Sequence, residues 1–164
     1  MAPDPQVFKS VLSRFASGVT VVTTREGERR HGLTVSAFSS VSAVPPRVLV
    51  CLSNDSDSKP MVERAGVFAV HILGQEHVAL GPRFAKMGVG PDDLFEGLTT
   101  RTEVTGSPIL SECLGWLDCQ VETALAVGSH TIFVGAVQAA GVGGDGEPVL
   151  YYARSFRSLD PKAL

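Results

Sequence analysis

Hydroxyl side chains gather in two short stretches of the sequence. Residues 34–42 contain five of them, and residues 53–58, which follow the next apolar run, contain three more. Small hydroxyls beside exposed backbone N–H groups suit a phosphate or the polar edge of a heteroaromatic ring, because they donate hydrogen bonds without bulk. The same residues are also ordinary in turns, and Ser56 or Asp57 could cap a helix. Since the two stretches end neighbouring predicted strands, they could converge on one ligand.

A histidine and an aromatic, cationic cluster are the other candidates for chemistry. His130 follows Gly128 and Ser129 and opens a strong strand, where its ring could stack on a planar ligand or simply face solvent. Residues 151–157 combine two tyrosines and a phenylalanine with two arginines. Such a cluster can hold a nucleotide by stacking and phosphate pairing, or can pack its rings on the body and leave its arginines in water.

Several other chemistries lack their motifs. No Gly-x-Gly-x-x-Gly lies between a strand and a helix, and neither a phosphate-binding P-loop nor a Gly-x-Ser-x-Gly elbow occurs. The four histidines show no metal-ligand spacing, and the three cysteines form no Cys-x-x-Cys pair, so we expect no metal site. Cys51 lies within an apolar strand, which disfavours a nucleophilic thiolate. We expect three reduced and mostly buried thiols.

The elements that must position these residues are mostly short strands. An amphipathic helix opens the chain, with Asp4 as its cap and Pro5 at its first position. We expect a short helix around residues 61–65, helical structure over 75–86 with Pro82 kinking or dividing it, and loop over 88–97. The 47–52 segment is apolar enough to be buried on both faces. Predicted strands cover residues 19–24, 31–40, 47–52, 67–73, 114–126, 130–142 and 149–152.

This order of elements favours a mainly β, antiparallel barrel with short helices. The 164 residues are 44% hydrophobic and 19% charged, which suits one folded domain over residues 1–164. A net charge of −3 argues against nucleic acid or an anionic membrane as partner. No apolar run approaches the roughly 18–20 residues that cross a bilayer, and the first residues do not resemble a signal peptide. We therefore expect a cytoplasmic location.

Taken in order, segments along nearly the whole chain resemble the flavin reductase family, whose fold is the FMN-binding Greek-key split β-barrel. Members of this family are the reductase components of two-component, flavin-dependent monooxygenases. Two details differ: the family often has Gly-Asp-His where this chain has Ser129 before His130, and an apolar residue is common at the position of Arg47. The matching segments are 14–23, 32–42, 45–52, Ser58, 68–70, 83–85, 128–135, 151–152 and Arg154.

The resemblance implies a role for each candidate residue. The isoalloxazine ring would lie along residues 34–38, and hydroxyls of both stretches would contact the ribityl chain and phosphate. Arg83 would lie near the phosphate or adenylate, and Tyr152 with Arg154 at the nicotinamide nucleotide. His130 would lie over the flavin, where the nicotinamide stacks, and is the one residue expected to be catalytic. The complete set of expected cofactor-binding residues is Thr34, Val35, Ser36, Ala37, Phe38, Ser39, Ser40, Ser53, Asn54, Ser56, Asp57, Ser58, Lys59, Arg83, Phe84, His130, Tyr152 and Arg154.

The resemblance also implies an activity and partners. NADH or NADPH would reduce FMN or FAD, and the reduced flavin would leave to serve a separate monooxygenase component; the protein would be a homodimer. Hydride transfer needs positioning and no protein nucleophile, which agrees with the lack of an evident acid–base pair. Two alternatives remain: a split-barrel flavoprotein that retains its flavin as an oxidase or electron carrier, and a flavin-binding module without catalysis.

Overall fold

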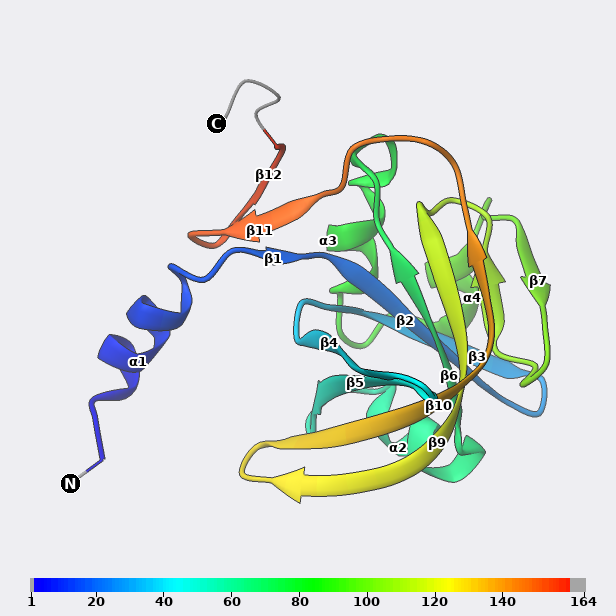
Figure 1. Cartoon of the computed structure of the whole chain (residues 1–164), viewed down its shortest axis with the longest axis horizontal. Helices are drawn as coiled ribbons and strands as arrows, with labels where there is room; N and C mark the ends of the chain where they lie inside the picture. The colour runs from blue at the N-terminus through cyan, green and yellow to red at the C-terminus, as the bar shows by residue number, and fades with distance from the viewer. Residues whose placement is uncertain (1, 160–164) are drawn as a thin grey trace.

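Two strands that follow one another in the chain form the opposite edges of the main sheet. The computed structural model describes residues 2–159, the side chains of Pro91 and Asp92 excepted. Its seven-stranded sheet has the order β3-β2-β6-β9-β10-β5-β4, and every neighbouring pair is antiparallel (Figure 1). The strands are β2 (Thr20–Glu26), β3 (Arg29–Val35), β4 (Phe38–Ala43), β5 (Pro46–Ser53), β6 (Val67–Ile72), β9 (Gly115–Val127) and β10 (His130–Val142).

The two edges of this sheet meet at one point. Only Ser36 and Ala37 separate the end of β3 from the start of β4. Because three residue steps span at most about 11 Å, the edges must approach each other here and the sheet is rolled. We call residues 34–38 the edge junction. This arrangement confirms the predicted mainly β, antiparallel fold of the split-barrel type.

Small sheets and short helices complete the described part of the chain. Among these residues no helix is long and apolar enough to cross a membrane. One small sheet contains β1 (Ser17–Gly18), β11 (Leu150–Tyr152) and β12 (Ser155–Arg157), and the other contains β7 (Thr100–Thr102) and β8 (Pro108–Leu110). The helices are α1 (Pro5–Leu12), α2 (Lys59–Ala65), η1 (Gln75–His77), α3 (Leu80–Phe84) and α4 (Pro91–Phe95).

The main core fills the inside of the rolled sheet. Val50, Phe68 and Phe133 are fully buried there, and the second core lies under α3 and α4 around Phe84 and Leu94. Burial of these apolar side chains is the main force that holds the strands together.

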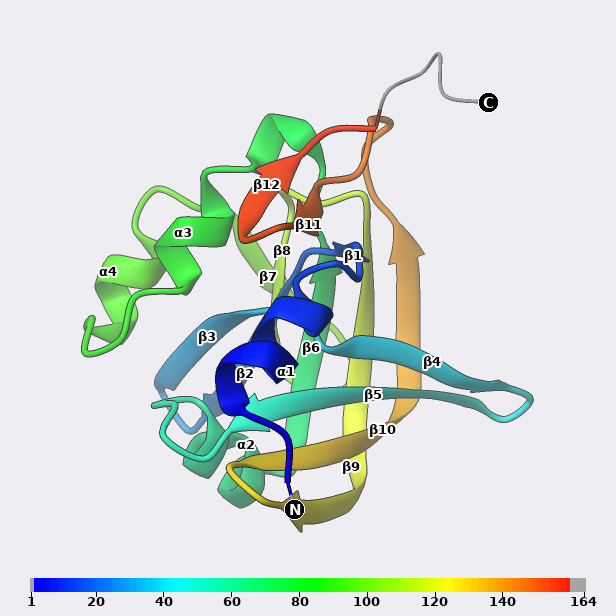
Figure 2. The same cartoon turned by 90° about the vertical axis from the view of Figure 1, so that its left-hand side faces the viewer.

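Helix α1 stands apart from both cores. As the sequence predicts, Asp4 caps it by accepting a hydrogen bond from the Gln6 N–H at 2.6 Å, and Pro5 occupies its first position. None of its residues is buried, and Figures 1 and 2 show it projecting beside β1 and β11. Its apolar face therefore does not contribute to the core of a single chain.

Several expected elements differ in detail. The strand expected over 31–40 is two strands, because the chain turns from one sheet edge to the other at residues 36 and 37. Helical structure over 75–86 divides into η1 and α3, and Pro82 lies inside α3. The 88–97 segment contains α4, so the prediction of loop there was wrong. The very short strands β1, β7, β8 and β12 were not predicted.

Strand β5 is not buried on both faces, contrary to expectation. Val48, Val50 and Leu52 point into the core, while Leu49 and Cys51 on the other face are only half-buried. The second apolar face of β5 is therefore not covered by the core and is free to contact another group.

Arg47 has an ion-pair partner across the sheet. Glu122 is the extra residue of a bulge in β9, where Val134 pairs with Thr123 and Gly135 pairs with Val121. The Arg47 guanidinium donates to both carboxylate oxygens of Glu122, and this bonding lowers the pKa of the Glu122 carboxyl. The cation that departs from the family pattern is thus matched by a carboxylate.

Candidate functional site

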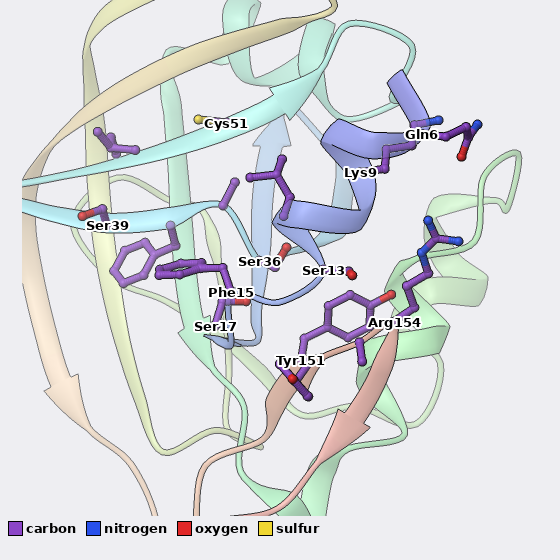
Figure 3. A pocket seen from close by; sticks show the side chains of 16 residues that line it. Gln6, Lys9, Ser13, Phe15, Ser17, Ser36, Ser39, Cys51, Tyr151 and Arg154 are labelled. Carbon is purple, nitrogen blue, oxygen red and sulfur yellow. The ribbon is translucent and has the colours of Figure 1, made fainter. Parts of the chain in front are cut away.

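A pocket of about 920 Å³ lies at the edge junction. Its walls come from α1, the edge strand β4 and its neighbour β5, and the turn between β11 and β12 (Figure 3). The apolar outer face of β5 supplies Leu49 and Cys51 to it. The lining residues are Gln6, Lys9, Leu12, Ser13, Phe15, Ser17, Ser36, Ala37, Phe38, Ser39, Leu49, Cys51, Tyr151, Tyr152, Ala153 and Arg154.

The chemistry of this first pocket suits a flat aromatic ligand that carries an anionic group. Aromatic and aliphatic side chains such as Phe15, Phe38 and Leu49 make most of its surface. Lys9 on α1 and Arg154 on the β11–β12 turn lie along one edge of it, as Figure 3 shows. The pocket therefore combines surface for stacking with two cations for phosphate pairing.

The turn that carries Arg154 has an unusual backbone. Ala153 and Arg154 have φ angles of 48° and 63°, which glycine adopts easily and other residues rarely do. The Ala153 N–H donates to the Ser13 carbonyl at 2.9 Å and so ties this turn to the end of α1. Strained turns of this kind persist where the surroundings fix them, often at ligand sites. The strain here places a cationic side chain at the pocket.

The backbone of the edge junction offers hydrogen bonds to a ligand. The Val35 carbonyl accepts from the Thr20 hydroxyl at 2.6 Å, and the Ala37 carbonyl accepts from the Cys51 N–H at 3.0 Å. Within residues 2–159, however, no strand pairs with the outer edge of β3 or of β4. Outward N–H and C=O groups of these edges remain available, as at any sheet edge.

A second, smaller pocket of about 160 Å³ lies on the other side of the edge junction. It brings together Thr34, Ser56, Asp57, Ser58 and Phe84, which the sequence assigned to one cofactor. Thr34 of the first hydroxyl stretch thus lies with Ser56 and Ser58 of the second, although β3 and β5 are not neighbouring strands and come together because the sheet is rolled. The remaining lining residues are His31, Gly32, Leu33, Ala85, Lys86 and Met87.

Hydrogen bonds hold the polar groups of this second pocket. Ser58 is buried, and its Oγ lies 2.6 Å from Nδ1 of His31. Burial lowers the pKa of His31. The ring is therefore neutral at pH 7, and only one of its nitrogens donates. Asp57 accepts from the Gly88 N–H at 3.0 Å, and Thr34 donates to the Gly81 carbonyl at 2.6 Å.

Other predicted site residues lie outside the two pockets. Val35 is buried, while Ser40 is exposed on β4. Lys59 pairs with Glu63 at 2.7 Å. Arg83 donates through Nη2 to the carbonyls of Asp93 and Glu96, at 3.0 and 2.6 Å, and so holds α4. The expected contact of Arg83 with a phosphate stays a prediction.

His130 lies at the start of β10, near the rim of the first pocket. His130 pairs with Ser53 of β5. Ser53 is two residues beyond Cys51, which lines the pocket, and two residues of a strand span about 7 Å. Nδ1 of His130 is 2.9 Å from the Ser129 hydroxyl, and the ring is exposed. Asn54 bonds to the carbonyls of Gly128 and Ser129, at 3.2 and 2.9 Å, and so fixes this turn.

Sequence reasoning missed the contribution of α1 to the site. Lys9, Gln6 and Phe15 were treated as an amphipathic helix and its end, and nothing local indicated which element they would face. Tyr151 belonged to the cluster that was singled out, but its strand neighbour Tyr152 was chosen. Leu49 and Cys51 could have been found from the sequence. A strand that is apolar on both faces, but buried in the core on one face only, can line a ligand pocket with the other.

The site contains groups for binding rather than for covalent catalysis. Burial raises the pKa of the Cys51 thiol, so the thiol that lines the first pocket is not an activated nucleophile. In the part of the chain that the structure describes, no group of three or more His, Cys, Asp or Glu side chains is placed to hold a metal ion. The arrangement can stack, orient and neutralise ligands.

Comparison with known proteins places this geometry in context. The sequence profile described as flavin reductase like domain matches residues 12–160. A flavin reductase of Pseudomonas putida is 35% identical over 152 residues, 92% of this chain and 88% of that protein. The FMN reductase (NADH) RutF 1 of Methylorubrum extorquens is 35% identical over 161 residues, 98% of this chain and 79% of that protein.

Further similarity links the chain to a two-component enzyme and to a solved structure. The reductase component of a 4-nitrophenol 4-monooxygenase/4-nitrocatechol 2-monooxygenase of Rhodococcus opacus is 36% identical over 158 residues, 96% of this chain and 83% of that protein. The crystal structure of a flavin reductase domain protein from Arthrobacter sp. FB24 has a TM-score of 0.89 at 28% identity, covering 98% of this chain and 99% of that one.

Proposed function

The chain belongs to the flavin reductase like domain family, and we propose that it reduces FMN or FAD with NADH or NADPH and supplies the reduced flavin to a separate monooxygenase. One observation carries this proposal: the edge junction runs between the two pockets, with Ser36, Ala37 and Phe38 lining one and Thr34 lining the other. A ligand with a flat ring at one end and a phosphate at the other fits that arrangement.

The residues present fit a flavin. Free backbone groups of a sheet edge can pair with the polar edge of the isoalloxazine ring, and the apolar face of β5 can support its rings. The hydroxyls of Ser56 and Ser58 line the second pocket, and Lys86 adds a cation there. The Ser56 hydroxyl, which donates to the Ser53 carbonyl at 2.8 Å, would have to turn to donate to the phosphate. This assignment keeps the predicted roles of both hydroxyl stretches.

Bound flavin supplies the redox chemistry by accepting a hydride from reduced nicotinamide. The protein then has to bind and orient the two ligands. Arg154 and Lys9 are placed to neutralise a nicotinamide nucleotide phosphate at the edge of the first pocket, and Tyr152 is placed to stack there. His130, which pairs with Ser53 two residues beyond Cys51, would orient the nicotinamide rather than abstract a proton.

Initial rates with each pairing of FMN or FAD with NADH or NADPH test the proposal. We expect nicotinamide oxidation, followed as loss of absorbance, only when flavin is added, and a rate that saturates with flavin. Dialysed protein should lose its flavin, because the first pocket is open to solvent along α1. A protein that binds flavin without turnover, or stays yellow and turns over without added flavin, would contradict the proposal.

A His130→Ala variant separates the histidine from the rest of the site. We expect a lower kcat with unchanged flavin affinity, because His130 lies outside the pocket lining. His77→Ala is the matched control, since His77 lies in η1 outside both pockets. Equal kcat values for wild type and the His130 variant would remove this role.

A homodimer in the cytoplasm is part of the same proposal. Phe8, Val11 and Leu12 on α1 and Leu125 and Val127 near the β9–β10 turn are all more than half exposed, which supports burial against a second copy. The three free cysteines suit a reducing compartment. Light scattering on a sizing column measures the mass, and we expect two chains in wild type and one in a Phe8→Glu, Val11→Glu variant.

A further inference from the structure

Three arginines line a polar pocket on the opposite side of the molecule from α1. The pocket has a volume of about 430 Å³, and its walls come from the β2–β3 hairpin and from β7. Figure 1 shows both elements at the far side from α1 and β11, which line the flavin site. The lining residues are Arg25, Arg30 and Arg101, Thr100 and Thr102, and also Glu28 and Pro108.

Aromatic rings hold two of these guanidinium groups in place. Cζ of Arg30 lies 4.5 Å from the centroid of Phe95, a buried residue of α4, and its Nη1 donates to the Thr100 hydroxyl at 3.4 Å. Cζ of Arg101 lies 5.0 Å from the ring centroid of Trp116. Stacking occupies the face of a guanidinium and leaves N–H groups on its edge free, so these donors are preorganised.

Carboxylates balance this positive charge only in part. Arg101 pairs with Glu103 at 3.0 Å, and Arg25 pairs at 3.3 Å with Glu28, whose side chain is 96% exposed and easily displaced. Among the side chains that the structure describes, no carboxylate pairs with Arg30. An excess of cations in one pocket of a chain whose net charge is −3 attracts anions to that place.

We propose that this pocket binds a multiply charged oxyanion of the phosphate class, with Arg30 as its main ligand. Guanidinium forks and hydroxyls together match the several acceptor oxygens of a phosphate, and Arg is suited to such bidentate contacts. A hollow in which three guanidinium groups outnumber one lining carboxylate, Glu28, fits a small anion better than an extended acidic segment of a protein. The proposal does not rest on the proposed reductase function, because none of these residues lines the flavin site.

Titration calorimetry with inorganic pyrophosphate tests the site in the full chain. We expect wild type to bind, Arg30→Gln to bind about tenfold or more weakly, and Arg30→Lys to bind with intermediate affinity, because it keeps the charge and loses the fork. Arg29→Gln is the matched control, since Arg29 carries the same charge on the same hairpin outside the pocket. It should change the affinity less than twofold.

Three results would overturn the proposal. Wild type that does not bind pyrophosphate has no such site. Equal weakening by Arg29→Gln and Arg30→Gln would mean that net charge alone attracts the anion. Arg30-dependent binding of a hexaglutamate peptide without binding of pyrophosphate would assign the surface to an acidic protein segment instead. Flavin reduction by each variant is measured in parallel. The comparison of pyrophosphate affinities does not depend on whether the variants reduce flavin.

Discussion

Acid should weaken the fold through one buried histidine, His71 of β6. Its Nδ1 donates to the Val21 carbonyl at 3.0 Å, and its Nε2 accepts from the Leu110 N–H at 3.1 Å, so the neutral ring joins β2, β6 and β8. Burial lowers the pKa of His71 from 6.5 to about 4, with a smaller contribution from the charge of Arg101. Protonation would place a charge in the core and remove the acceptor that Leu110 uses.

The sign and size of the effect follow from linkage. Above pH 6.5 neither the folded nor the unfolded chain protonates His71, and its contribution to stability is complete. As the pH falls from 6.5 to 4, only the unfolded chain takes up the proton, so stability is lost across this window. The pKa difference corresponds to about 3 kcal/mol in total, of which about 2 kcal/mol is lost by pH 5.

Urea unfolding at about pH 7 and pH 5 measures this loss. His71→Gln cannot titrate, so wild type should lose about 2 kcal/mol more than the variant between the two pH values. At pH 7 the variant should itself be less stable by about 1–3 kcal/mol, because buried backbone groups lose a partner. His77→Gln is the control and should follow wild type. Equal losses in wild type and His71→Gln would refute the reasoning.

Three further perturbations test packing, strain and ligand placement. Gly135→Ala should cost about 1–3 kcal/mol in urea unfolding, since an added Cβ would lie 2.5 Å from the Phe68 ring; an unchanged midpoint contradicts this. Ala153→Gly should raise the free energy of unfolding by up to about 1 kcal/mol, because φ is 48° there; a decrease would show that the turn is not strained. Alkylation of Cys51, followed by mass spectrometry, should slow about tenfold at a flavin concentration of ten times Kd, and an unchanged rate would place the ring elsewhere.

The sequence was most informative where local pattern and tertiary role coincide. Hydroxyls at 34–42 and 53–58 mark strand ends, and the second pocket joins Thr34 of the first stretch to Ser56 and Ser58 of the second. These strands, β3 and β5, are not neighbours in the sheet, and their ends approach because the sheet is rolled. Asp4 and Pro5 likewise specify a helix start by local hydrogen bonding and φ. The hydroxyl stretches thus indicated part of the second pocket, and Asp4 with Pro5 indicated the start of α1.

The rest depends on contacts between segments far apart in the chain. Nothing near Lys9 indicates that α1 lies beside the turn that carries Arg154 and lines the same pocket. Arg83 suggested a phosphate ligand, yet its side chain bonds to carbonyls of a helix that was itself expected to be loop. Gly90 and Pro91 were an available sign of that helix start, since Pro suits the first turn. The left-handed turn at Ala153 has no sequence signal, because glycine or asparagine would be expected there.

The open strand edges at residues 34–38 also bear on aggregation. An unpaired edge is a template on which another chain can add a strand, and most proteins cover it or place charges on it. Beyond its serines, β4 carries exposed Val41, and Val44 follows it in the turn to β5. A ligand lying along this edge would block intermolecular strand pairing, and under the proposed binding mode flavin would therefore cover the edge as well as react. We then expect the soluble yield to rise when flavin is supplied during expression, measured as the soluble fraction with and without added riboflavin.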